Sequence, residues 1–342
     1  MNKPTIYDIA REANVSIATV SKVINGIGRV SDATRKRVLQ IVADLNFEPN
    51  VVASALAGGN TRTIGLLLPD VNNPYFSEIV RGAEDEAFGR GYSVLICNTD
   101  HNAKKEHEYI RTLRQKQMDG IAIATGSTPA QTIEELVEGK IPVVLLSRSI
   151  LGASVATVAV DSYAGGRLAA EYLISLGHKA VGYLSEPLTV TSSVERLRGF
   201  QEVMDEHGRT TVLSSDHGFG ITTGQRMAAQ LLSNPEITAL FGANDQLAVG
   251  ALQACREMGR KVPEQISVVG FDDTVFAKIV TPTLTTVAQP MYQMGAQTLR
   301  LLIEAIETGV QPTKSIVFPP ELMIRESAGP IRFHERAGSQ PG

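Results

Sequence analysis

Side chains suited to binding a polyhydroxy ligand come directly after several short apolar runs of the sequence. They are carboxylates, amides, an arginine and aromatic rings, at Asp70, residues 73–76, Ser147, Arg148, Asp161, residues 244–246 and residues 270–273. If the apolar runs are parallel strands, their carboxyl ends meet at one edge of a sheet, where open α/β sheets bind ligands. Carboxylates and amides bond to sugar hydroxyls, and aromatic rings cover sugar C–H faces, so this set predicts a sugar site. Asp161 and Asp245 have an equal alternative role as caps of the helices that follow them.

The sequence lacks the common motifs of enzymes. In the nearest phosphate-loop candidate, residues 218–224, the glycine spacing differs from the dinucleotide-binding fingerprint, and no Walker motif occurs. The six histidines do not form a zinc-binding His-Glu-x-x-His pattern. Cys97 and Cys255 are expected to be buried thiols. We therefore expect a protein that is not an enzyme and that needs no metal or cofactor.

The order of elements after Arg62 explains how the sugar-binding side chains come together. Short apolar runs alternate there with amphipathic segments, which is typical of βαβ units and a parallel sheet. In a first set we expect strands at residues 64–68, 93–97, 120–124, 143–146 and 157–160, with helices near 75–90, 104–117 and 129–137. In a second set we expect strands at 180–184, 211–214, 239–243 and 267–270, with helices near 165–176, 192–206, 222–232 and 246–258. The body is thus expected to be two α/β lobes of doubly wound parallel sheets, with the ligand between them.

Residues 1–48 have a different pattern. Thr5 to Asp8 form a capping pattern for a helix over residues 6–13, and Asn14 can take the left-handed conformation that ends it. Ser16 caps a second helix over 17–25, and Ser31 caps a third from 32 to about 45. Two short helices joined by so tight a turn predict a helix-turn-helix in a three-helix head.

The second helix of the head presents side chains that suit a DNA major groove. Ile17 and Ala18 can contact thymine methyls, and Lys22 can donate to guanine. Residues 1–62 carry eight basic and five acidic side chains, a net charge of +3, whereas the other 24 basic and 31 acidic side chains give −7. A basic head on an acidic body favours a polyanionic partner, although periodicity alone leaves a helical hairpin that packs on protein as an equal alternative.

The head resembles the DNA-binding head of the LacI/GalR family of bacterial transcription regulators. The similarity rests on residues 5–10 (Thr-Ile-Tyr-Asp-Ile-Ala), residues 14–25, Val30-Ser31 and Thr34-Arg35. The resemblance implies that Ile17, Ala18 and Lys22 read bases. It implies that a second set lies near DNA phosphates: Tyr7, Ser16, Thr19, Ser21, Asn25, Arg29, Ser31, Thr34 and Asn50.

Residues 49–61 join the head to the body. Pro49 ends the third helix, and Asn50 can cap a short helix over 51–57 that ends at Gly58-Gly59. So short a helix is marginal alone, so it either orders only with a partner or is a plain linker. The segment resembles the family's hinge helix, which implies that Leu56 enters the minor groove at the centre of the operator.

The resemblance continues through the body, most specifically at residues 69–76, 196–200, 243–245, 269–273 and 281–290. It implies a periplasmic-binding-protein-like body over 62–342, with lobe one at about 62–161 plus 290–320 and lobe two at about 162–289 plus 321–330. It implies an effector cleft lined by Asn73, Tyr75, Phe76, Arg148, Asp161, Arg196, Phe219, Asn244, Asp245, Asp272 and Gln289. Many relatives have Asp-Arg where this chain has Ser147-Arg148. The missing carboxylate leaves Arg148 without an obvious neighbour and favours a sugar acid or sugar phosphate over a neutral sugar.

We therefore expect a DNA-binding transcription repressor that binds a pseudo-palindromic operator as a homodimer and responds to a small sugar-like effector. The tail, residues 330–342, lacks the heptads of a tetramerising coiled coil. The apolar runs at 64–69 and 141–146 are too short to span a membrane. Residues 1–10 lack the apolar segment of a secretory signal, so the chain is expected to be cytoplasmic.

Two other functions are considered. Residues 289–302 resemble the docking segment of the family's catabolite control proteins for a phosphorylated carrier protein, with Tyr292 and Arg300 as candidate contacts. A helix that faces the core and a dimer partner is the alternative role of that segment. A sugar-binding protein without a DNA role fits the body but gives the head no purpose.

Overall fold

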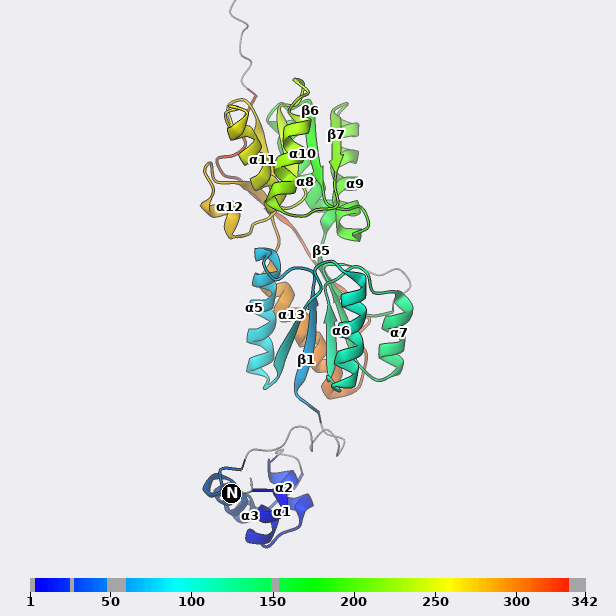
Figure 1. The fold of residues 1–342 in the computed structure, drawn as a ribbon, viewed down its shortest axis with the longest axis vertical. Coiled ribbons are helices and arrows are strands. Elements are labelled where there is room, and N and C mark those ends of the chain that lie inside the picture. The colour runs from blue at the N-terminus through cyan, green and yellow to red at the C-terminus, as the bar shows by residue number, and fades with distance from the viewer. Residues whose placement is uncertain (1–3, 25–27, 48–59, 149–153, 332–342) are drawn as a thin grey trace, which may run out of the picture. The chain divides into compact units, whose positions relative to one another are not determined.

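The computed structural model describes residues 4–24, 28–47, 60–148 and 154–331, and the chain divides into two compact units, Met1–Thr61 and Arg62–Gly342 (Figure 1). Asn25, Asn50 and Leu56, which the sequence assigns to DNA contacts, lie outside the described residues. No helix of the described ranges is long and apolar enough to cross a membrane.

The described residues of the first unit form three helices, α1 (Ile6–Glu12), α2 (Ile17–Ile24) and α3 (Asp32–Asp44), as the sequence predicts. The backbone N–H of Thr5 donates to Asp8 at 3.0 Å, and Asn14 ends α1 in the left-handed region with φ of 50°. Ile9, Val20 and Val38 are fully buried between the helices. Burial of these apolar side chains, one from each helix, holds the three helices together.

The second unit consists of two lobes, each built on a six-stranded sheet (Figure 1). The sheet of lobe one has the order β11-β5-β4-β3-β1-β2, and that of lobe two has the order β12-β10-β9-β8-β6-β7. The strands of lobe one are β1 (Thr63–Leu68), β2 (Ser93–Asn98), β3 (Gly120–Ile123), β4 (Val143–Leu146), β5 (Thr157–Val160) and β11 (Ile316–Phe318). Those of lobe two are β6 (Ala180–Ser185), β7 (Thr210–Ser215), β8 (Ala239–Gly242), β9 (Ser267–Asp272), β10 (Thr285–Ala288) and β12 (Glu321–Met323). The strand pairs are parallel except β10 with β12.

Helices pack on both sheets. Lobe one has α5 (Pro74–Gly89), α6 (Ala103–Gln115), α7 (Ala130–Glu138) and α13 (Met291–Thr308). Lobe two has α8 (Ser162–Ser175), α9 (Thr191–Glu206), α10 (Ile221–Leu231), α11 (Asp245–Glu257) and α12 (Val275–Ile279). This confirms the expected pair of α/β lobes.

The strands β10, β11 and β12 were not predicted from the sequence. They carry the chain between the lobes, because β10 lies in lobe two, α13 and β11 in lobe one, and β12 again in lobe two. With the passage from β5 to α8, the chain crosses between the lobes three times. Loops at the carboxyl ends of the strands carry many of the residues that line the cleft described below.

Helix pairs in both lobes make close backbone contacts at glycines. A Cβ at Gly82 of α5 would overlap the carbonyl group of Tyr292 in α13, and one at Gly295 would overlap that of Ile79. The same reciprocal contact joins Gly166 of α8 and Gly199 of α9 to each other's helix. These positions fix the helices against one another at a separation that a larger residue would prevent.

Candidate functional site

The exposed face of α2 carries the side chains predicted to read bases. Val20 and Val23 point into the core of the head, which leaves Ala18 and Lys22 exposed and Ile17 with 39% of its surface exposed. Lys22 lies beside the left-handed Gly28, where an added Cβ would be 3.4 Å from the lysine Cδ. Two small apolar side chains beside a lysine can contact both thymine methyls and guanine acceptors.

The N-termini of α2 and α3 are suited to phosphates. The hydroxyl oxygen of Ser16 accepts from the N–H of Thr19 at 3.2 Å, and that of Ser31 accepts from the N–H of Thr34 at 3.3 Å. The remaining free N–H groups of a helix N-terminus favour anions. Tyr7 and Arg29 are exposed, whereas Ser21 is half-buried.

The second unit contains a cavity of about 760 Å³ lined by loops of both lobes. Among the eleven predicted effector contacts, eight line it: Asn73, Tyr75, Phe76, Arg148, Arg196, Phe219, Asp272 and Gln289. Carboxylates, hydroxyls and rings from both lobes surround it, which agrees with a set of polar side chains placed after the strands.

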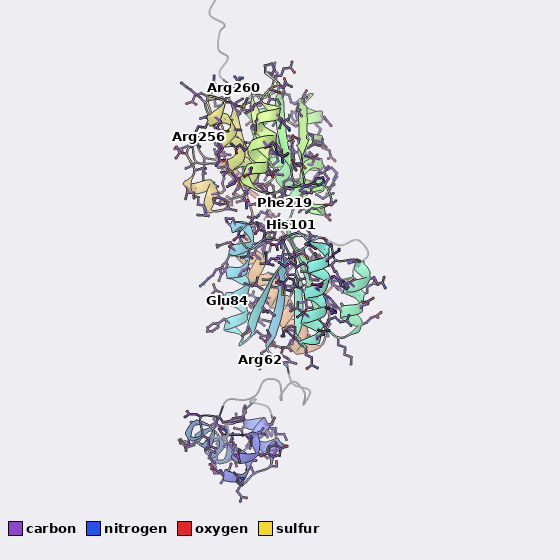
Figure 2. The ribbon with its side chains drawn as sticks, viewed as in Figure 1. Arg62, Glu84, His101, Phe219, Arg256 and Arg260 are labelled. Carbon is purple, nitrogen blue, oxygen red and sulfur yellow. The ribbon has the colours of Figure 1, made fainter. Side chains whose placement is uncertain are left out.

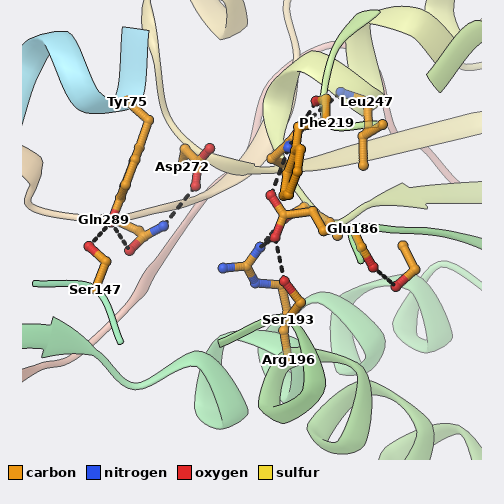
Figure 3. Close-up of polar contacts among 12 residues, drawn as sticks. Tyr75, Ser147, Glu186, Ser193, Arg196, Phe219, Leu247, Asp272 and Gln289 are labelled. Atoms are coloured by element: carbon orange, nitrogen blue, oxygen red, sulfur yellow. Dashed lines mark hydrogen bonds and ion pairs between the residues drawn. The ribbon is translucent and has the colours of Figure 1, made fainter. Parts of the chain in front are cut away.

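A series of hydrogen bonds between side chains of the cleft connects the two lobes (Figure 3). Tyr75, on α5, has its hydroxyl 2.5 Å from the Ser147 hydroxyl and donates to Oε1 of Gln289 at 3.3 Å. The Gln289 side chain then donates to Asp272 at 2.7 Å. Burial and the neighbouring Asp245 raise the pKa of Asp272 well above its usual value, which favours its uncharged form.

A second polar group surrounds Glu186, which follows β6 (Figure 3). Its carboxylate accepts from the Asn244 amide at 2.8 Å and from the Ser193 hydroxyl at 2.6 Å. The guanidinium of Arg196 lies 3.7 Å from it and 3.6 Å from the centre of the Phe271 ring. Arg196 is only 4% exposed, so it forms a buried ion pair that is also supported by an aromatic face.

Arg148 lies on the lobe-one wall of the cavity. Burial lowers the pKa of its guanidinium to about 10, while the charges of Glu106 and Glu186 oppose that change. Its Nε is buried and, within the described residues, has no hydrogen-bond partner. Glu106 is itself buried and accepts from Thr128 and from the N–H of Ser127. Arg148 therefore has nearby carboxylates, contrary to the sequence expectation.

Comparison with known families agrees with the two-unit architecture. Residues 5–50 match the model for bacterial regulatory proteins of the lacI family, and residues 170–328 match that for a periplasmic binding protein-like domain. The HTH-type transcriptional regulator DegA of Bacillus subtilis (strain 168) is 38% identical over 336 residues, which cover 96% of this chain and 99% of DegA. The chain belongs to the lacI family.

Two solved structures resemble this lacI family member closely. The lac repressor dimer bound to operator and the anti-inducer ONPF is 28% identical, with a TM-score of 0.83 over 96% of this chain and 100% of its own. A LacI family transcriptional regulator from Enterococcus faecium with bound ribose is 29% identical, with a TM-score of 0.74 over 79% of this chain and 100% of its own. The chain is thus a DNA-binding transcriptional regulator whose body has the sugar-binding architecture of this family.

Three predicted effector contacts of this lacI family member do not line the cavity. Asp161 accepts from the N–H of Ala164 at 2.9 Å and caps α8, the alternative that the sequence left open. Asn244 caps α11 and bonds to Glu186. Asp245 is fully buried and accepts from both Thr274 and Thr286. All three side chains are bonded to neighbouring groups of the chain, whereas the other eight line the cavity.

Sequence reasoning missed Glu106, Glu186 and His101, which line the cavity. Glu186 follows a predicted strand and could have been found by the same rule as Asp70. Glu106 lies within α6, where an acidic residue in a first turn is ordinary, so no sequence signal separates it from a surface residue.

The segment that resembles a phosphocarrier docking site lies on α13. Its candidate contacts are already bonded to α5: the Tyr292 hydroxyl donates to Asp85 at 3.1 Å, and Arg300 pairs with Glu86 at 3.0 Å. Arg90 also pairs with Glu86. These contacts join two helices of lobe one, which favours a structural role for Arg300 over capture of a phosphate.

Proposed function

We propose that this lacI family member is a repressor that binds a pseudo-palindromic operator as a homodimer and is controlled by a neutral sugar in the cleft of its body. Ile17, Ala18 and Lys22 read bases, and the Ser16 and Ser31 ends of α2 and α3 hold phosphates. Two-fold symmetry of a homodimer matches the two half-sites of such an operator.

The balance of charge in the cleft is the observation that carries the proposal of a neutral ligand. Arg196 is paired with Glu186, and Arg148 lies in the field of Glu106 and Glu186. Asp100 is paired with Lys105 at 2.6 Å, and Asp272 is held toward its uncharged form. The positive charges of Arg148 and Arg196 are thus already balanced by carboxylates and do not neutralise the charge of an anionic ligand. Asp70 adds a further carboxylate to the lining. An anionic sugar would bring an uncompensated charge into this cavity, which is costly away from water.

The chemical character of the lining fits a polyhydroxy compound. Arg148 and Asn73 offer donors, Glu186 and Asp70 offer acceptors, and Phe76 and Phe219 offer apolar ring surface. The related regulator from Enterococcus faecium was solved with ribose, an uncharged sugar. This replaces the expectation from Ser147-Arg148 that a sugar acid or sugar phosphate is preferred.

A thermal-shift screen of the full chain tests the effector class. Neutral pentoses, hexoses and disaccharides are compared with sugar acids, sugar phosphates and purines. A ligand at 100 times its dissociation constant stabilises by about 2.7 kcal/mol, which moves the melting midpoint by several degrees. Stabilisation confined to neutral sugars is expected, and stabilisation confined to anionic sugars would contradict the charge argument.

The same ligand is then measured with Arg148→Ala and with Arg114→Ala, an exposed arginine of α6 that does not line the cavity. We expect Arg148→Ala to raise the effector's dissociation constant about 10-fold or more, because a hydrogen bond from a charged group contributes about 1.5–3 kcal/mol. Arg114→Ala should leave it unchanged. An unchanged constant for Arg148→Ala would remove Arg148 from the binding site.

A further inference from the structure

Two rings from different lobes lie face to face in this structure. The imidazole of His101, just after β2 of lobe one, stacks on the ring of Phe219, between β7 and α10 of lobe two (Figure 2). The ring centroids are 4.1 Å apart, and the planes differ by 8°. Both residues line the cavity, while His101 is exposed on its outer side.

The backbone that carries His101 is held in an unusual conformation. Asp100 and His101 both have left-handed backbones, with φ of 53° and 55°. Such a pair of non-glycine residues is strained and persists only where surrounding bonds enforce it. The Asp100 carboxylate accepts from Asn98 and from Lys105, both at 2.6 Å. The turn therefore fixes the direction of the His101 side chain.

The loop that carries Phe219 is equally well supported. Its carbonyl accepts from the Asn244 amide at 3.2 Å, and the same amide bonds to Glu186. Asp216, at the start of this loop, pairs with Arg226 of α10. The backbone of Phe219 thus belongs to the same bonded group as the Glu186 carboxylate of lobe two, and the position of Phe219 follows that lobe.

The spacing of the rings determines where an effector can lie. At 4.1 Å between centroids the two rings are in van der Waals contact, so no sugar fits between them. Arg148 and Glu186 line the same cavity without taking part in the stack.

We propose that His101 and Phe219 form a latch that closes one side of the cleft and makes His101 a determinant of effector entry and release. The consequence for the effector depends on the proposed function, but the latch itself does not. An effector lies behind the stacked rings, and the rings must separate when it enters or leaves.

The latch can be tested without an effector, because the chain contains no tryptophan. Phe219→Trp places the only tryptophan of the chain in the stack, and its emission is excited selectively over that of the tyrosines. Quenching by acrylamide is measured for Phe219→Trp alone and combined with His101→Ala, His101→Phe or His107→Ala. His107 is an exposed histidine of α6 and serves as the matched control.

We expect His101→Ala to raise the quenching constant about two-fold or more, because the covering ring is removed. His101→Phe should keep the low constant, since it restores a stacking ring, and His107→Ala should not change it. Equal quenching with and without the His101 ring would overturn the latch.

A second pair of variants provides the same test if Phe219→Trp fails to fold. His101→Trp, at an exposed position, is compared with His101→Trp combined with Phe219→Ala. The latch predicts higher quenching when the Phe219 ring is absent, and no difference contradicts it. Because neither comparison uses a sugar, a failed effector screen leaves this result interpretable.

Discussion

The Tyr75 hydroxyl donates to Oε1 of Gln289 at 3.3 Å and so joins α5 of lobe one to the crossing segment that follows β10. Gln289 in turn bonds to Asp272 of lobe two. Tyr75 and Asp272, at the two ends of this bonded path, both line the cavity. The path is therefore a physical means for the cleft to set the relative position of the lobes, and the following variants test its parts.

Tyr75→Phe should weaken this connection without opening a cavity. The variant keeps the buried ring and removes the hydroxyl that bonds to Ser147 and Gln289. We expect a loss of about 0.5–1.5 kcal/mol in the free energy of unfolding, the net worth of a typical hydrogen bond. Urea denaturation measures it, with Tyr7→Phe as the control because Tyr7 is 68% exposed. A loss no larger than the control's would show that the bridge does not stabilise the body.

Lys22→Ala should reduce sequence discrimination by the head. If Lys22 donates to guanine, its removal costs about 1–3 kcal/mol on the preferred duplex and relaxes preference at one base position. Fluorescence anisotropy with the preferred and an unrelated duplex, at one salt concentration, measures both effects. Lys36→Ala, an exposed lysine of α3, is the control. An equal loss on both duplexes would mean that Lys22 contacts only phosphate.

Gly295→Ala should destabilise lobe one. The added Cβ would overlap the carbonyl group of Ile79, which is backbone and cannot rotate away. Overpacking of this kind costs about 1–3 kcal/mol. Gly89→Ala, at the end of α5, has no atom within 4 Å of the added Cβ and should be neutral or slightly stabilising. Thermal melting of the two variants compares them directly, and equal midpoints would refute the close contact of α5 and α13.

The buried His178 should make stability depend on pH below neutrality. Burial lowers the pKa of its imidazole from 6.5 to about 4, and the ring nitrogens bond to Thr238 at 2.9 Å and Ser267 at 3.0 Å. The folded state keeps the ring neutral while the unfolded chain takes up a proton. Stability from this group is therefore complete above pH 6.5 and is lost as the pH falls toward 4, by up to about 3 kcal/mol.

His178→Gln should remove most of that pH dependence while lowering stability at pH 7. Urea denaturation at pH 7, 6 and 5 provides the comparison, with the exposed His107→Gln as the control. An unchanged slope of stability against pH in His178→Gln would show that another group causes the dependence.

The sequence predicts most of the fold because alternation of apolar runs and amphipathic segments is a local signal. It fails for β10, β11 and β12, which have four, three and three residues. None of the three contains an apolar run of four residues, because β10 begins with two threonines and β11 and β12 have only three residues. Pairing with β9, β5 and β10 makes them strands. Tertiary contacts, absent from any local pattern, decide these three elements.

The sequence predicts only some of the residues that line the cleft, because the direction of a side chain also depends on tertiary packing. The rule that ligands bind beyond strand ends finds Tyr75, Arg148 and Asp272, but it does not say which way each side chain points. Asn244 and Asp245 both follow β8. Their side chains bond to Glu186 and Thr274 and do not line the cavity. Glu106 reaches the cavity from inside a helix. Only the packing of the loops separates these cases.

If a sugar in the cleft controls the repressor, the cleft and the DNA face must be thermodynamically coupled. The decisive measurement is the dissociation constant of the full chain for its preferred duplex, with and without a saturating concentration of the sugar that stabilises it. We predict a change of about 5- to 150-fold, with an equal change in the affinity for the sugar when the duplex is present. Identical dissociation constants in the two conditions would contradict the account.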